Sequence, residues 1–154
     1  MTFFEGYLLR TGGVVRLEED LLEALIPLRR PAGYYAVGDY IRPQRSSGYL
    51  YVATSAGFAG HREPRWLTAD VIVDGSVVWA PRLVGGAGLP TIASVTWTSV
   101  GASGLTIAEQ SFSGYRIRAN VSGGVIGGRY RVEAEATIST GEIVIRTFEV
   151  IRAS

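Results

Sequence analysis

The stretch that decides the fold runs from Tyr34 to Trp79 and reads YYAVGDYIRPQRSSGYLYVATSAGFAGHREPRWLTADVIVDGSVVW. Short runs of β-branched and aromatic residues, which favour strands, alternate here with glycine-containing turns. Val71–Val73 and Val77–Trp79 flank Asp74-Gly75-Ser76, which predicts a hairpin because glycine tolerates positive φ. We therefore predict a small aromatic-rich β unit over residues 34–84.

Beyond this unit, Val84-Gly-Gly-Ala-Gly-Leu-Pro90 is typical of a linker, and residues 91–154 contain further strands. Polar and apolar residues alternate over 115–121 and 129–136, which gives each strand one wet face and one buried face. This predicts an antiparallel β-sandwich with Trp97 in its core. The final strand, Ile143–Ile151, is apolar on both faces apart from a break at Arg146-Thr147, which indicates a bulge or a central position.

Residues 1–33 are predicted to be a separate N-terminal segment with one short amphipathic helix. The run from Leu17 to Ile26 has helical periodicity, and acidic residues avoid its apolar stripe. Two interpretations remain open: the stripe covers the protein's own core, or it docks onto a neighbouring subunit. We name as candidate partner-binding residues Leu17, Leu21, Leu22, Leu25 and Ile26. On the second interpretation, a chain without residues 1–30 would keep its β units folded.

The composition excludes several classes of function. The chain has 154 residues and a net charge of +1, so it carries no strong field that would recruit nucleic acid. It has no cysteine, which excludes disulfides, thiolate metal sites and cysteine nucleophiles. No run of about eighteen apolar residues is present, so we expect no membrane-spanning helix. The first residues also lack the basic start of a signal peptide.

The residues that could carry chemistry are sparse. His61, the single histidine, lies in a glycine-rich loop without an evident orienting partner or nucleophile. Glu133 and Glu135 share a strand face with Arg129 and Arg131, which favours a solvated ladder of ion pairs over a catalytic carboxylate pair. We therefore predict a protein that is not an enzyme, with no catalytic residue, no metal site and no cofactor.

Aromatic residues are concentrated in the small β unit. Exposed flat rings on a β surface bind sugars or protein partners, whereas a unit this small also needs large side chains to fill its core. The residues to which both interpretations apply are Tyr35, Tyr40, Tyr51, Trp66 and Trp79.

Residues 34–66 carry the pattern Y-x-x-G-D-x-[VI]…G-x-x-Y-x-[AC]-T-x-A-G…E-P-x-W. This pattern resembles the small chitin-binding type of carbohydrate-binding module. With the appended D-G-S-V-V-W hairpin, it is more similar to a version found in tailed-bacteriophage virion proteins. The matching residues are Tyr35, Gly38, Asp39, Tyr40, Gly48, Tyr51, Thr54, Gly57, Gly60, Glu63, Pro64, Trp66, Asp74, Gly75 and Trp79.

Residues 92–151, with I-A-S-V-T-W-T and S-G-L-T-I-A-E-Q-S-F-S-G, resemble the short immunoglobulin-like domains of phage structural proteins. The combination is similar to phage fiber-tail adaptors and minor virion proteins. The implied fold is mainly β: a small aromatic-rich unit followed by an Ig-like antiparallel sandwich, with one short N-terminal helix.

The implied function is that of a non-enzymatic virion protein that links tail or neck proteins to fibres. Expected partners are tail, neck, portal-proximal or fibre proteins, with several copies in a symmetric assembly, and neither nucleic acid nor membrane. The protein would be made in the host cytoplasm and reside in the tail or neck of the virion. Two alternatives remain: a capsid decoration (cement) protein, and a carbohydrate-binding module that recognises host-surface glycans.

Overall fold

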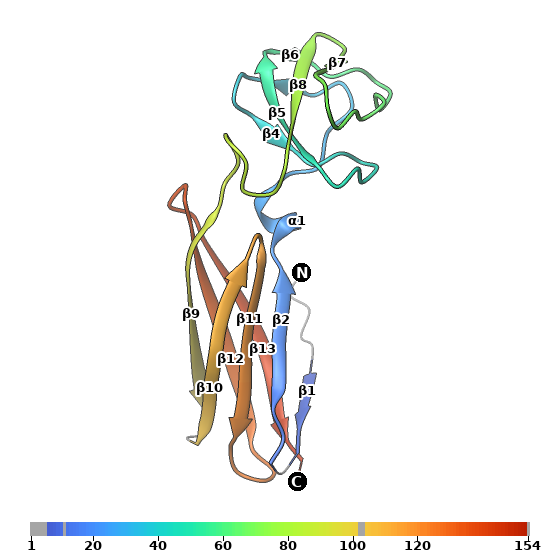
Figure 1. The fold of residues 1–154 in the computed structure, drawn as a ribbon. Coiled ribbons are helices and arrows are strands. Elements are labelled where there is room, and N and C mark those ends of the chain that lie inside the picture. Colours follow the sequence, from blue (N-terminus) through green and yellow to red (C-terminus); the bar gives the residue numbers. More distant parts are fainter. Residues whose placement is uncertain (1–5, 11, 102–103, 154) are drawn as a thin grey trace. The chain divides into compact units, whose positions relative to one another are not determined.

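A computed structural model of the protein describes residues 6–10, 12–101 and 104–153. The chain divides into two compact units, Met1–Leu21 with Thr91–Ser154, and Leu22–Pro90. Strands are the main regular elements of both units; in the second unit they are short and are joined by long loops (Figure 1). The fold class predicted from the sequence, mainly β with an antiparallel sandwich, is confirmed.

The first unit contains two sheets. One sheet has four strands, in the order β1 (Gly6–Leu9), β13 (Ile143–Arg152), β12 (Arg129–Ile138) and β9 (Ile92–Gly101). The other has three strands, in the order β10 (Leu105–Ser113), β11 (Arg116–Gly123) and β2 (Val15–Asp20). The pairing of β1 with β13 is parallel and every other pairing in these two sheets is antiparallel.

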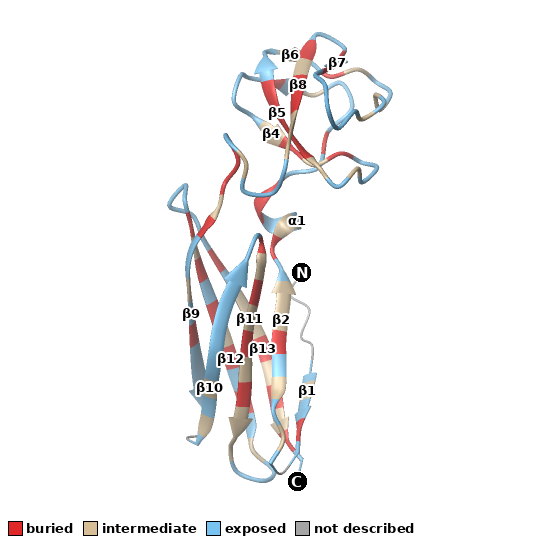
Figure 2. Ribbon diagram, in the orientation of Figure 1, coloured by how far each residue is buried: buried red, intermediate tan, exposed pale blue. Residues whose placement is uncertain are grey.

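The predicted alternation of buried and wet faces is confirmed. Figure 2 shows buried and exposed residues alternating along β12. The buried side chains of β11 and β12 are Ile117, Ala119, Val121, Tyr130, Val132, Ala134, Ala136 and Ile138. Trp97 is also in the core, since it is only 5% exposed and its ring stacks on Phe148 with 5.5 Å between the centroids.

The final strand, β13, has a central position, between β1 and β12. Its pairing with β12 runs without a register shift from Ile143 to Ile151, so the alternative of a bulge at Arg146-Thr147 is wrong for this pairing. Arg146 interrupts the apolar pattern because it reaches the three-stranded sheet, where its Nε donates to Glu19 Oε1 at 3.2 Å. β13 is apolar on both faces because Val144, Phe148 and Val150 cover the core, while Ile143 and Ile145 on the other face are exposed.

The predicted helix from Leu17 to Ile26 is wrong. Residues Val15–Asp20 form β2, and only the single turn α1 (Leu22–Leu25) is helical. β2 pairs with β11 in a register that places Glu18 opposite Arg118, and Glu18 also accepts a hydrogen bond from Arg116. That bond lowers the pKa of Glu18. An isolated ten-residue helix is marginal in water, so strand pairing with an oppositely charged neighbour decides the conformation.

The predicted N-terminal segment of residues 1–33 is not a separate part of the fold. β1 adds a strand to one sheet of the sandwich and β2 adds a strand to the other. Their side chains Leu9 and Leu17 are completely buried. The chain passes between the units at residues 21–22 and 90–91, so the predicted boundary at residue 33 is corrected to residue 21.

The second unit is built on a small antiparallel sheet. Its four strands occur in the order β4 (Tyr40–Ile41), β5 (Leu50–Ser55), β8 (Val77–Arg82) and β7 (Ile72–Asp74). A further pair consists of β3 (Tyr34–Tyr35) and β6 (Gly57–Phe58). The predicted hairpin is confirmed as β7–β8, with Gly75 at φ 62°. Among the described residues, no helix has the length and apolar character needed to cross a membrane.

Candidate functional site

A buried ion pair lies at the centre of the second unit. The side chains of Arg29 and Asp74 are 0% and 1% exposed. Nε and Nη2 of Arg29 donate to Oδ2 and Oδ1 of Asp74, each at 2.8 Å. Nη2 also donates to the backbone oxygens of Gly60 at 2.7 Å and Arg62 at 3.0 Å. The guanidinium therefore joins the β7–β8 hairpin to the loop around residues 60–62.

Asp74 accepts two further hydrogen bonds, from Gly60 N at 2.9 Å and from Trp79 Nε1 at 3.1 Å. Burial by itself would raise the pKa of Asp74, but the hydrogen bonds from Arg29, Gly60 and Trp79 lower that pKa below its ordinary value. The bond to Asp74 in turn raises the pKa of Arg29. Both groups therefore stay charged, and their role is to fix the fold of this unit. The sequence pattern did not reveal this pair, because nothing local distinguishes Arg29 from its exposed neighbour Arg30.

Two tryptophans of similar burial, Trp79 and Trp97, allow a test of how much the hydrogen bond to Asp74 stabilises the second unit. Trp79 Nε1 donates to Asp74, whereas Trp97 Nε1 is buried without a hydrogen-bond partner among the described residues. Trp79→Phe and Trp97→Phe remove the same ring volume, so the first should be more destabilising by about 1.5–3 kcal/mol, the value of a hydrogen bond to a charged group. Peptide-resolved hydrogen exchange measures the opening free energy of each unit separately. Equal losses for the two variants would contradict the prediction.

A pocket of about 420 Å³ lies on the same unit, between residues 45–47 and 63–66. Glu63 connects its two sides, because Glu63 Oε1 accepts hydrogen bonds from Arg45 N and from Trp66 Nε1, each at 2.6 Å. The half-buried ring of Trp66 packs against buried Tyr51, with 4.5 Å between the ring centroids. The lining residues are Arg45, Ser46, Ser47, Glu63, Pro64, Arg65 and Trp66.

The five aromatic candidates divide between the two interpretations left open by the sequence. Tyr35, Tyr51 and Trp79 belong to the buried core of the second unit. Tyr40 and Trp66 are half-buried, and Trp66 also lines the pocket of about 420 Å³ between residues 45–47 and 63–66. Trp66 therefore combines contact with the core and access to a partner.

The five candidate partner-binding residues do not form one exposed stripe. Leu17 lies on β2 and Leu21 follows it, whereas the other three belong to the second unit. The structure thus corrects the prediction of a docking helix, because strand pairing of residues 15–20 breaks the helical periodicity. Leu22 is half-buried and lines a pocket of about 240 Å³. The buried members are Leu17, Leu21, Leu25 and Ile26.

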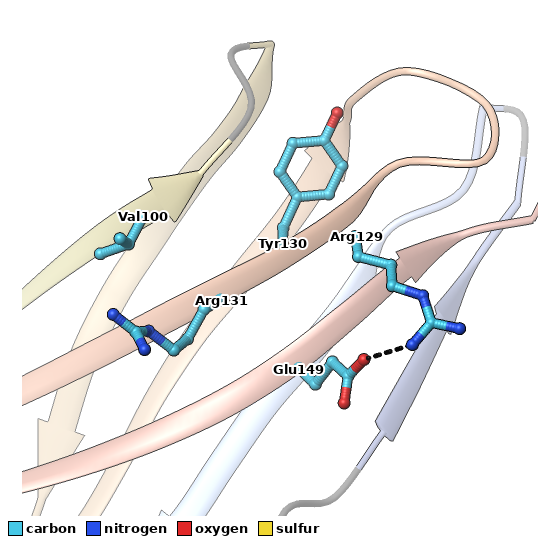
Figure 3. A pocket seen from close by; sticks show the side chains of 5 residues that line it. All are labelled: Val100, Arg129, Tyr130, Arg131 and Glu149. Atoms are coloured by element: carbon cyan, nitrogen blue, oxygen red, sulfur yellow. Dashed lines mark hydrogen bonds and ion pairs between the residues drawn. The ribbon is translucent and has the colours of Figure 1, made fainter.

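The solvent side of the four-stranded sheet, here called the outer face, combines ion pairs with exposed apolar side chains. Val100, Arg131 and Glu149 lie in register across β9, β12 and β13, beside a pocket of about 260 Å³ (Figure 3). Figure 3 shows Arg129 directed toward Glu149, with 3.5 Å between Nη1 and Oε1. The exposed apolar residues of this face are Leu8, Val100, Ile143 and Ile145.

The predicted ladder of charges on β12 is also present on this face. Arg131 Nε lies 3.3 Å from Glu133 Oε1, which supports the interpretation of Glu133 as an ion-pair partner of arginine; Glu135 is exposed and forms no ion pair among the described residues. His61 is exposed in its loop. Within residues 6–10, 12–101 and 104–153, no three histidine or acidic side chains are grouped so that they could hold a metal ion.

Comparison with known proteins supports one family. The family model described as podophage GP4 fiber-tail adaptor protein gp77 matches residues 67–151, which is more than half of the chain. The matched part begins just after the pocket that Trp66 lines and continues into β13. No curated protein and no solved structure matches the chain. The chain belongs to the family of podophage GP4 fiber-tail adaptor proteins.

Proposed function

We propose that this protein is a non-enzymatic adaptor that links tail or neck proteins of the virion to fibres. Its family identifies it as a structural adaptor of the phage virion, located in the tail. The partners in this proposal are tail, neck, portal-proximal and fibre proteins, and several copies of the chain act in one symmetric assembly.

The observation that carries this proposal is the outer face of the four-stranded sheet. Ile143 and Ile145 are each more than half exposed, and they lie in register beside Thr137 and Glu135 of β12. Two exposed isoleucines on a rigid strand supply apolar area to a partner without the ordering that a loop would require. Two pairs of neighbouring charges, Arg129 with Glu149 and Arg131 with Glu133, can be covered by a partner as neutral pairs. Glu135, opposite Ile145, has no ion pair among the described residues, so a partner that covers it would have to supply a donor or a cation.

The two units are proposed to have separate parts in this assembly. We propose that the sandwich is immunoglobulin-like, which is supported by its two sheets of four and three strands, antiparallel except for the pairing of β1 with β13. The small unit is proposed to be a variant of the chitin-binding-module type that serves protein contacts. Its β7–β8 hairpin and its core tryptophan, Trp79, support this.

A double variant of the outer face tests the adaptor function. Ile143→Ser with Ile145→Ser should leave the protein folded, because both side chains are exposed, but should reduce its incorporation into particles at least tenfold. Ile126→Ser is the matched control, since Ile126 is 67% exposed in a turn of the same unit. The measurement is the amount of this chain and of fibre protein in purified particles, by quantitative mass spectrometry. Normal incorporation of the double variant would show that the outer face is not the docking surface.

A further inference from the structure

We propose that the pocket lined by Trp66, here called the Trp66 pocket, binds an acidic segment of another virion protein, with a carboxylate beside an aromatic side chain. This inference rests on the proposed adaptor function and adds to it a second contact surface, on the other unit, with a defined partner chemistry. It follows from the charge of the pocket, from its aromatic wall and from the rigidity of its walls.

The charge of the Trp66 pocket is unbalanced toward arginine. Arg65 lines the pocket, is exposed, and forms no ion pair among the described residues. Arg45, on the opposite side, is 92% exposed and has its Nε 3.8 Å from Glu63 Oε2, a long contact in solvent. Such an exposed pair contributes little, so both guanidiniums can accept a new anionic partner. Arginine binds a carboxylate with two parallel hydrogen bonds, which favours a carboxylate as that partner.

The carboxylate of Glu63, which is already in the pocket, does not neutralise both arginines. Glu63 Oε1 accepts hydrogen bonds from both Arg45 N and Trp66 Nε1, so this oxygen is occupied in holding the walls. Glu63 is therefore a positioning residue. Arg65, which forms no ion pair among the described residues, and Arg45, whose contact with Glu63 is long and exposed, remain available to a ligand.

The walls of the Trp66 pocket are fixed before any ligand binds. Trp66 is held by Glu63 and by the ring of Tyr51. The hydroxyl of Tyr51 hydrogen-bonds Ser47 Oγ at 2.9 Å and donates to Leu67 O at 3.0 Å, which joins the two segments that flank the pocket. A preorganised site loses little conformational entropy on binding, and tryptophan and arginine are the side chains that most often anchor protein interfaces.

The indole of Trp66 determines the second half of the ligand. Its nitrogen is bound to Glu63, so the part of the ring that remains accessible offers an apolar surface. Aromatic side chains pack on such a surface in offset or edge-to-face geometry. A segment with an aspartate or glutamate next to an aromatic residue satisfies both features together. The pocket volume of about 420 Å³ accommodates more than one side chain.

The experiment is a titration of the full-length, ¹⁵N-labelled protein with the tripeptide acetyl-Phe-Glu-Phe-amide, followed by the indole N–H signals of its three tryptophans. The signal of Trp66 is identified by its loss in Trp66→Phe. We expect the peptide to shift this signal selectively, since Trp79 and Trp97 are buried. Acetyl-Phe-Gln-Phe-amide should bind at least tenfold more weakly, because it lacks the negative charge.

Charge reversal provides the matched control. Arg65→Glu should abolish the shift of the Trp66 signal, whereas Arg62→Glu, at an exposed position that does not line the pocket, should leave affinity within about twofold. Equal affinity for the glutamine peptide would overturn the carboxylate requirement. A shift of the same size with inorganic phosphate at equal concentration would replace the peptide site with a general oxyanion site. No shift with any of these probes would overturn the proposal entirely.

The result is independent of the adaptor function, because the titration does not involve particles. Failure of the titration, together with loss of incorporation in the Ile143→Ser, Ile145→Ser variant, would remove the Trp66 pocket and keep the adaptor. A positive titration with normal incorporation of that variant would keep the pocket as a binding site and remove the outer face as the docking surface.

Discussion

A chain that lacks residues 1–21 should fail to form the β-sandwich. The deletion removes β1 and β2, and with them one strand from each sheet. It also removes the completely buried side chains of Leu9 and Leu17 and uncovers the edges of β13 and β11. An uncovered apolar edge favours aggregation over folding. The measurement is hydrogen exchange over residues 91–154, where protection in β11, β12 and β13 should be lost.

Two neighbouring leucines of β1 give this prediction a control that does not depend on a truncated chain. Leu9→Ala should destabilise the sandwich by about 2–5 kcal/mol, the range for deleting a buried leucine side chain. Leu8→Ala should change its stability by less than about 0.5 kcal/mol, because Leu8 is 54% exposed. Equal effects of the two substitutions, or a protected β12 in the truncated chain, would mean that the N-terminal strands are dispensable for folding.

Arg29→Met should destabilise the second unit by about 3–5 kcal/mol, the range for removing one partner of a buried ion pair. The substitution leaves Asp74 buried with only Gly60 N and Trp79 Nε1 as donors. It also frees the backbone oxygens of Gly60 and Arg62, which lose the hydrogen bonds from Arg29. Peptide-resolved hydrogen exchange over residues 50–82 should report the loss, with residues 129–138 of the other unit as an internal reference.

The matched control is Arg45→Met, since Arg45 is 92% exposed and its ion pair with Glu63 should contribute no more than about 1 kcal/mol. The double variant Arg29→Met, Asp74→Leu should recover part of the loss, because an apolar pair replaces an uncompensated charge. A double variant less stable than Arg29→Met alone would mean that Asp74 stabilises the unit through its other donors.

The pH dependence of the free energy of unfolding is a second, independent test of the ion pair between Arg29 and Asp74. In the wild type the folded-state pKa of Asp74 is lowered, so the stability it contributes is present above its ordinary pKa of 3.8 and is lost as the pH falls through the folded value. In Arg29→Met the main donor is gone, so burial should raise the pKa of Asp74 instead. When Asp74 of the variant is protonated at acidic pH, its buried carboxyl is neutral and no longer destabilises the fold as an unpaired charge. The stability difference between wild type and variant should therefore shrink between pH 7 and pH 4, as measured by exchange at both values.

Local patterns in the sequence determined much of the strand structure. The Asp74-Gly75-Ser76 turn between two apolar runs specified the β7–β8 hairpin, because glycine is needed at positive φ. The period-two alternation over residues 129–136 specified which side of β12 is buried, and the shared strand face of Val95 and Trp97 predicts Trp97 in the core. Such features depend on residues that are close in sequence, so they can be predicted without the tertiary structure.

Tertiary structure alone decided the features that depend on distant residues. The stretch from Leu17 to Ile26 has helical periodicity, yet its first part became a strand because Arg116 and Arg118, almost a hundred residues away, pair with Glu18. The ion pair of Arg29 with Asp74 joins residues 45 positions apart. The same reason governs Trp66, whose ring is half-buried because Tyr51 and Glu63 hold it at the rim of a pocket. Periodicity in the sequence shows which residues can lie on the same face of a helix or strand. Contacts with residues distant in the sequence decide which element that face packs against, and so which conformation forms.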